Sequence, residues 1–131
     1  MNRSTFLKVL IAGLPGLFAF NPARQKKSAR LAVVWLAGYA YYRAPALINV
    51  IPAGASIELR REPSNPYDNR AIEVFFNEQK LGYIPRADNE WPAALMDAGV
   101  RLHAKVMWTS PDDPDNWQKL RMEVIMEIQT G

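Results

Sequence analysis

The sequence predicts a mainly β (α+β) fold in which six short strands form a small closed or half-closed barrel with one helix over an end. Three observations support this fold class. Several short segments alternate apolar and polar residues, turn-forming residues separate these segments, and one segment has helix boundary signals at both ends. A chain of 131 residues has the length of one domain with its own core.

The first part of the domain is predicted to contain an apolar strand, a helical turn and a half-buried strand. Segment 31–42 (LAVVWLAGYAYY) is rich in β-branched and aromatic residues and too apolar for a sheet edge, which predicts a central strand. Pro45 and Pro52 bracket a segment that is a short helix or helical turn at most. Charged and apolar residues alternate in 56–60, as in a strand with one buried face.

A β-hairpin is predicted next. Apolar residues fall on one face of the segment 71–76, which is typical of a half-buried strand. Residues 77–79 (NEQ) reverse the chain, and residues 80–84 (KLGYI) pair back against the first strand. Pro85 ends the second strand of this hairpin.

The segment 88–98 (DNEWPAALMDA) is predicted to be a helix. Asp88 or Asn89 can cap its start, and Pro92 is tolerated in its first turn. Gly99 provides the stop at its C-terminal end. We assign the large apolar side chains of this helix to the core: Trp91, Leu95 and Met96.

Two longer alternating strands, 102–108 and 120–128, complete the predicted fold. The segment 111–115 (PDDPD) between them is expected to be an exposed acidic loop. The apolar faces of the two strands carry Leu102, Ala104, Val106 and Trp108, and Leu120, Met122, Val124, Met126 and Ile128.

Residues 1–30 differ in composition from the domain proper, which is predicted to span 31–131. An apolar run at 9–20 follows a short basic start, and it is shorter than the roughly 20 residues that a membrane-spanning helix needs. Two interpretations remain open: a leader that directs export or anchors the chain, or an amphipathic helix on the domain or on a membrane surface. The expected location is cytoplasmic if the chain binds DNA, and the cell envelope if the leader is an export signal.

The positive charge of the chain is concentrated in its first segment. Lysine and arginine number 16 against 13 acidic residues, which gives the whole chain a net charge of +3. Residues 1–30 contain six basic residues and no acid, so residues 31–131 have ten basic residues against 13 acids, a net charge of −3. A body with this balance cannot coat duplex DNA by counterion release alone, so nucleic-acid binding requires a local pocket.

The sequence offers few groups for catalysis or metal binding. It has no cysteine, and the single His103 cannot form a histidine-based metal site by itself, so we interpret His103 as a strand residue. Gly-rich phosphate loops, a nucleophile elbow and an HExxH motif are all missing, and no acidic residues show a recognisable catalytic spacing. We therefore predict a protein that is not an enzyme and that needs no metal or cofactor.

The segment 61–74 (REPSNPYDNRAIEV) is polar but carries one tyrosine in its middle. Pro66 pushes Asn65 into an extended conformation, and the fixed φ of the proline suits the first corner of a turn. Asp68 or its neighbour can close that turn with a side-chain hydrogen bond. Two readings of Tyr67 follow: a ring tucked into the edge of the core, or a ring and a carboxylate that face outward as a pocket wall.

The run 59–74, followed by 81–86 (LGYIPR), resembles the HIRAN domain family. The family pattern is a strand ending in R-E-P, then N-P-Y-D, a two-residue gap to A-I-x-V, a G-Y-[IL]-P-[RK] hairpin and a short helix. The similarity extends over about 31–128. It implies a variant of the OB barrel, so the expected fold becomes a small six-stranded OB-like barrel with one added helix.

Characterised members of the family lie at the N-terminus of helicase-like proteins of DNA repair and fork remodelling, where the domain holds the 3′ end of single-stranded DNA. By position, the resemblance assigns Tyr67, Asp68 and Asn65 to the tyrosine, aspartate and asparagine of that pocket. Tyr41 matches the aromatic residue on the first strand, and Arg86 matches a basic position that faces phosphate. Together with the neighbouring tyrosine, the candidate nucleic-acid-binding residues are Tyr41, Tyr42, Asn65, Tyr67, Asp68 and Arg86.

The resemblance implies a nucleic-acid-binding module that holds a 3′ end of single-stranded DNA in a Tyr/Asp/Arg pocket. A tyrosine can stack on any base, and a carboxylate accepts a hydrogen bond from a free 3′ hydroxyl but repels a phosphate. Two positions depart from a member of known function: Ala40 stands in place of an arginine and Tyr83 in place of a histidine. The alternative is an exported or membrane-associated module of the same fold that binds a protein or a small ligand.

Overall fold

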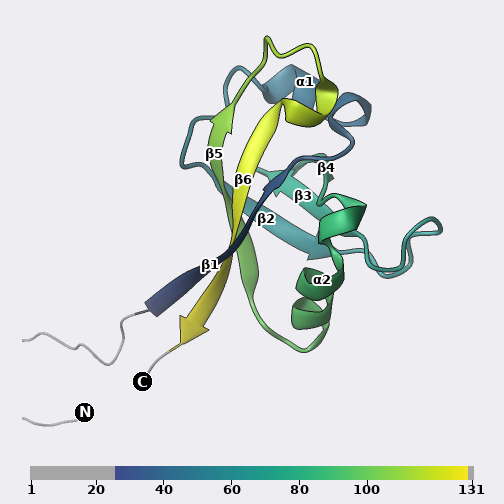
Figure 1. Ribbon diagram of the computed structural model, residues 1–131, viewed down its shortest axis with the longest axis vertical. Coiled ribbons are helices and arrows are strands. Elements are labelled where there is room, and N and C mark those ends of the chain that lie inside the picture. The colour runs from purple at the N-terminus through teal and green to yellow at the C-terminus, as the bar shows by residue number, and fades with distance from the viewer. Residues whose placement is uncertain (1–25, 130–131) are drawn as a thin grey trace, which may run out of the picture. The chain divides into compact units, whose positions relative to one another are not determined.

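The computed structural model describes residues 26–129 of the chain (Figure 1). Residues 29–127 form one compact unit. The expectations for the leader therefore fall mostly on residues outside the described part, and the boundary at residue 30 stays a prediction. No helix among the described residues is long and apolar enough to cross a membrane.

Six strands and two α-helices make up the described part of the chain. Three short 3-10 helices, at Tyr39–Tyr41, Arg86–Asp88 and Asn116–Gln118, lie in the connections. The strands and helices, in chain order, are β1 Lys26–Trp35, α1 Ala44–Leu47, β2 Ser56–Arg61, β3 Ile72–Phe76, β4 Gln79–Tyr83, α2 Glu90–Asp97, β5 Leu102–Thr109 and β6 Leu120–Gln129.

The strands form a single sheet in the order β1-β6-β5-β2-β3-β4, which confirms the mainly β class. The pairs β2–β3, β2–β5, β3–β4 and β5–β6 are antiparallel. Asn77 and Glu78 both have positive φ, as a two-residue hairpin turn of this type requires, and they join β3 to β4. The predicted hairpin is therefore confirmed.

The prediction of a central strand at 31–42 is wrong on two points. The strand β1 ends at Trp35 and lies at one end of the sheet, and Gly38 with a φ of 74° begins a 3-10 helix where further strand was expected. The apolar composition has a different cause. Val34 and Leu36 face the core, while Trp35 packs against two other tryptophans, so both faces of the segment are covered although one edge is unpaired.

The sheet does not close into a full barrel. One isolated bridge, between Ala37 and Tyr83, joins the segment after β1 to β4 at the other end of the sheet. Each residue donates its N–H to the carbonyl of the other over 2.9 Å. The bridge depends on Gly82, because a Cβ at this position would stand 2.1 Å from the carbonyl oxygen of Ala37.

The predicted helix is present as α2, with Asn89 at its N-cap position and Gly99 beyond its end at a φ of 93°. Of the three side chains that were assigned to the core, one is exposed. The helix buries Pro92 and Ala93, whereas Trp91 is exposed. Successive residues of an α-helix point about 100° apart around its axis. Trp91 directly precedes the buried Pro92 and therefore lies beside the buried face rather than on it.

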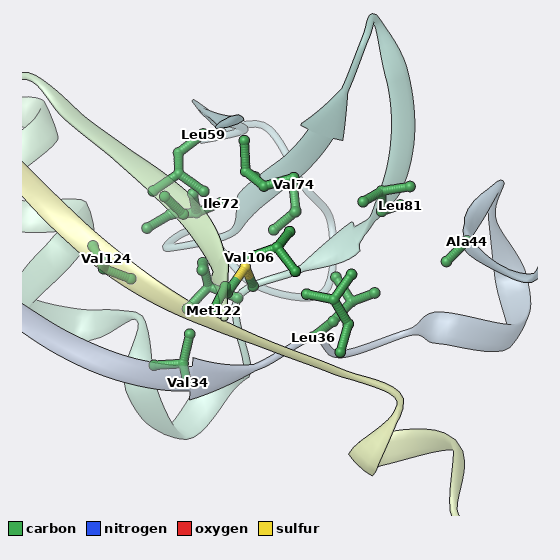
Figure 2. Close-up of a cluster of buried hydrophobic side chains, with 14 of the residues drawn as sticks. Val34, Leu36, Ala44, Leu59, Ile72, Val74, Leu81, Val106, Met122 and Val124 are labelled. Carbon is green, nitrogen blue, oxygen red and sulfur yellow. The ribbon is translucent and has the colours of Figure 1, made fainter. Parts of the chain in front are cut away.

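The core consists of side chains from all six strands, and Figure 2 shows how they interdigitate. Alternate residues of β2 and β6 point inward, as their sequence pattern predicts. Trp108 is an exception, since it was assigned to the buried face of β5 but is 46% exposed. A β-bulge between Val106 and Trp108 shifts the alternation and turns the indole outward.

Gly82→Ala should lower the free energy of unfolding by about 3 kcal/mol or more, because the new methyl group collides with backbone that cannot rotate away. Gly54→Ala is the matched control, since Gly54 also has a positive φ but has open space where the Cβ would stand. It should cost about 1 kcal/mol. Urea unfolding of both variants measures the difference, and equal losses would contradict the role of Gly82.

Candidate nucleic-acid interface

The loop between β2 and β3 is held by turns that its own side chains cap. The Asn65 side-chain oxygen accepts hydrogen bonds from the backbone N–H groups of Tyr67 at 2.8 Å and Asp68 at 3.1 Å. The Asp68 carboxylate accepts from the N–H of Arg70 at 3.0 Å, which confirms the predicted side-chain closure. Pro66 fixes its own φ between these contacts, so the loop has little freedom to rearrange.

Arg61 ties this loop to the C-terminal turn of helix α2. The Arg61 guanidinium donates to the carbonyl oxygens of Ala71 at 2.7 Å and Asn69 at 3.0 Å. The same group forms a two-pronged ion pair with Asp97 at 2.9 and 3.1 Å. Backbone and helix are thus joined through one planar cation, a geometry for which arginine is well suited.

The Tyr67 ring points away from the core and is 84% exposed, so the reading that tucked it into the core edge is wrong. Arg86 donates from its guanidinium to the Tyr67 carbonyl over 3.0 Å. This bond places a cation from the connection after β4 against the loop. The ring is therefore presented outward by a backbone that is fixed at both sides.

The Asp68 carboxylate is held in place and kept ionised. Its second oxygen accepts a hydrogen bond of 2.7 Å from the side-chain amide of Asn89, which is fully buried. Partial desolvation works against the charged form, but the bonds from Arg70 and Asn89 and the charge of Arg86 outweigh it and lower the pKa of Asp68. Each carboxylate oxygen keeps capacity for a further donor.

These groups line an open pocket with a volume of about 420 Å³. The pocket lies between the segment after β1, the β2–β3 loop and the end of β4. Five of the six predicted residues line it, and the full lining is Ala37, Tyr42, Asn65, Pro66, Tyr67, Asp68, Ala71, Tyr83, Ile84 and Arg86. The sixth, Tyr41, lies in a 3-10 helix rather than on a strand, is 84% exposed and is not part of the lining.

A hydrogen-bonded network joins Tyr83, which lines the pocket, to Glu62 and Lys80, which are not part of the lining. The Tyr83 hydroxyl donates to Glu62 over 2.6 Å, and Lys80 donates to the same hydroxyl over 2.7 Å. The bond from Tyr83, followed by one from Asn65, lowers the pKa of Glu62. Burial alone would lower the pKa of Lys80, but its contacts with Tyr83 and Glu73 raise it, so the ammonium stays charged.

The same lysine orients the aromatic part of the pocket. The rings of Tyr42 and Tyr83 meet edge to face with their centroids 5.8 Å apart. The Lys80 ammonium lies 4.3 Å from the Tyr42 centroid and 4.2 Å from the Tyr83 centroid. Cation–π attraction therefore holds both rings against one charge and keeps Tyr42 at the pocket wall.

The sequence prediction missed three residues that shape this site, Glu62, Lys80 and Asn89, and it noted Tyr83 only as a departure from a histidine of the family. Asn89 was interpreted as one of two candidate helix caps, yet its side chain makes no capping hydrogen bond. A helix needs only one cap, so the presence of two cap-type residues, Asp88 and Asn89, was the signal that one of them could have another role. Lys80 and Tyr83 stand three apart, which places them on opposite faces of a regular strand. A register shift opposite Val74 and Phe75 brings these two side chains together. Gly82 was the only residue in the sequence that indicated this shift, because a glycine inside a strand often marks a β-bulge.

Asn89→Leu should raise the pKa of Asp68, because the carboxylate loses a hydrogen-bond donor that favours its charged form. Titration of the side-chain carboxyl carbon by NMR measures this shift. Asn69→Ala is the control, since Asn69 contributes only a backbone carbonyl to the loop contacts described above. An unchanged Asp68 titration in the Asn89 variant would contradict the contact.

Tyr83→Phe should destabilise the protein by about 1 kcal/mol at neutral pH, a value reduced for solvent screening at a partly exposed carboxylate. The folded pKa of Glu62 lies below its usual value of about 4.3, so its bond stabilises the fold above that pH and is lost in acid. The difference between wild type and variant in urea unfolding should therefore shrink from pH 7 to pH 3. A constant difference would show that the hydroxyl acts by packing alone.

Comparison with known proteins gives a consistent result. A sequence model of the HIRAN domain matches residues 30–129. The crystal structure of a protein from Lactobacillus plantarum is similar with a TM-score of 0.70 and 30% identity, over 79% of this chain and 98% of that one. The crystal structure of the HIRAN domain of human HLTF is similar with a TM-score of 0.58 and 24% identity, over 76% of this chain and 74% of that one.

No curated protein matches the chain. The match to the domain family nevertheless spans most of the residues that the structure describes, including the β2–β3 loop and the end of β4. Eight of the ten residues that line the pocket belong to the segments that carried the resemblance in the sequence, and Ala37 and Tyr42 lie outside them. The chain belongs to the HIRAN domain family.

Proposed function

We propose that this chain is a nucleic-acid-binding module that holds the 3′ end of single-stranded DNA in the pocket between Tyr42, Asp68 and Arg86. The observation that carries the proposal is an ionised carboxylate, fixed by two donors, at the wall of an open pocket with exposed aromatic rings and a guanidinium. Membership of the HIRAN family supports a binding module rather than a catalytic one.

Aromatic rings provide the affinity in this proposal. A base can stack on the exposed ring of Tyr67, and Tyr42 offers a second ring in the pocket lining. Stacking on an aromatic side chain contributes about 1 to 3 kcal/mol per base and depends little on the identity of the base. The pocket should therefore accept any terminal base.

Charge provides the selectivity. Asp68 has free acceptor capacity and no proton to donate, so it binds a hydroxyl and repels a phosphate at the same place. Arg86 and Arg70 lie close enough to lower the Asp68 pKa, and they can meet the phosphate one linkage further along the strand. With few phosphate contacts, binding should depend only modestly on salt.

A protein segment or small ligand is the second candidate, because about 420 Å³ also lies within the volume range of small-molecule sites. Neither candidate involves catalysis. Among the described residues, no three His, Asp or Glu side chains come together as a metal site would require. The aromatic rings and paired charges favour the nucleic-acid candidate over a purely apolar ligand.

The test measures the affinity for three versions of one oligonucleotide: with a free 3′ hydroxyl, with a 3′ phosphate, and circular. The free end should bind best. Asp68→Asn should abolish the preference for hydroxyl over phosphate, because a neutral amide no longer repels the phosphate. Asp88→Asn removes the same charge from an exposed residue outside the pocket lining and should leave the preference intact.

Tyr67→Ala should weaken binding of the free end by about tenfold or more, from the loss of one stacking contact. Tyr41→Ala removes an equally exposed ring outside the pocket and should weaken binding less. Fluorescence anisotropy with an oligonucleotide labelled at its 5′ end gives both affinities. Equal binding of free, phosphorylated and circular strands by the wild type would overturn the proposed 3′ specificity.

A further inference from the structure

Three of the four tryptophans of the chain meet outside the pocket, and together with Arg121 they form what is here named the tryptophan surface. Trp35 lies at the end of β1, Trp108 on β5 and Trp117 in the connection between β5 and β6. The Trp35 ring meets the other two edge to face, with centroids 6.4 Å and 5.9 Å away. Trp108 is 46% exposed and Trp117 is 57% exposed.

The three rings are not among the buried residues of the core. Leu120, Met122 and Val124 are fully buried on the inner face of β6, while Arg121 points to the other face. The Arg121 guanidinium lies 4.5 Å from the Trp35 ring centroid, and among the described residues it forms no salt bridge. Exposed large rings beside a cation without a carboxylate partner are the combination that binds stacked bases and phosphates.

The tryptophan surface and the pocket are connected through one continuous segment of the chain. Ala37 lines the pocket, and Trp35 stands two residues before it in the same extended segment, so their Cα atoms are at most about 7 Å apart. Leu36 between them is buried, so its neighbours point to the other side of the segment. The N–H of Leu36 donates to the Leu120 carbonyl over 3.0 Å, which fixes this segment beside Arg121.

From this continuity we infer that the tryptophan surface binds the nucleotides on the 5′ side of the strand end held in the pocket. The inference rests on the proposed function and extends its site from one terminal nucleotide to several. Trp108 and Trp117 stack on bases, and Arg121 meets the backbone between them. A site of about four or more nucleotides is the usual scale for a fold of this size and type.

The acidic loop beside Trp117 sets the character of this binding. Asp112 and Asp115 are exposed there, and their carboxylates repel a phosphate backbone. The Lys119 ammonium, which the carbonyls of Pro111 and Asp113 hold inside the loop, offsets one of the loop's three carboxylates, so the net charge there stays negative. Bases rather than phosphates therefore face this part of the surface, and neutralising the carboxylates should strengthen binding.

The experiment compares a trinucleotide with a decanucleotide of the same base, both with a free 3′ hydroxyl, by calorimetry. The wild type should bind the longer strand more tightly by about tenfold or more, as one or two added stacking contacts provide. Trp117→Ala should remove most of this length dependence, and Trp117→Phe should restore part of it. Asp115→Asn should strengthen decanucleotide binding more than trinucleotide binding.

Tryptophan emission gives a second readout that needs no variant, because stacking on the surface should quench it with the decanucleotide and much less with the trinucleotide. Tyr67→Ala separates the two proposals, since it should weaken both lengths. If Tyr67→Ala weakens both strands while Trp117→Ala and Asp115→Asn change neither, the inference falls and the proposed function stands. If the wild type binds neither length, both fall, and the tryptophan surface serves a partner other than single-stranded nucleic acid.

Discussion

The paired backbone hydrogen bonds between Ala37 and Tyr83 connect two parts of the sheet that the strand ladder leaves apart. One side of the pocket comes from the segment after β1 and the other from the end of β4, so the pocket exists only where these two segments touch. The contact is possible because residue 82 has no side chain. Tyr42 belongs to the pocket lining and follows the segment that this close approach holds beside β4.

Charge is divided between the network around Tyr83 and the rim of the pocket. In the network, the Lys80 ammonium is balanced by Glu73 and by the Tyr83–Glu62 pair, so its charge is used to hold rings and hydroxyls in place. At the rim, Arg86 is exposed and bound to a backbone carbonyl, which leaves its charge available to a ligand. By this division, a body with an excess of acids presents a positive charge at the rim of the pocket.

Periodicity predicted the fold class, the hairpin and helix α2, because half-buried strands and amphipathic helices require particular residues at fixed intervals. It failed at Trp108 and at the pair formed by Lys80 and Tyr83, where β-bulges shift the alternation and leave little trace in the sequence. Composition misled at 31–42, because an apolar strand can have both faces covered and one edge free. Nothing in the sequence pairs a buried Asn89 with an acid 21 residues earlier.

The Arg61 guanidinium joins the β2–β3 loop to helix α2 through Ala71, Asn69 and Asp97. The loop cannot swing away from the sheet without breaking this cation's contact with the helix, or taking the helix with it. A displacement of the loop is thereby linked to a displacement of the helix, or to the loss of these four hydrogen bonds. Two distant parts of the chain, the rim of the pocket and the C-terminal turn of α2, therefore share one cation.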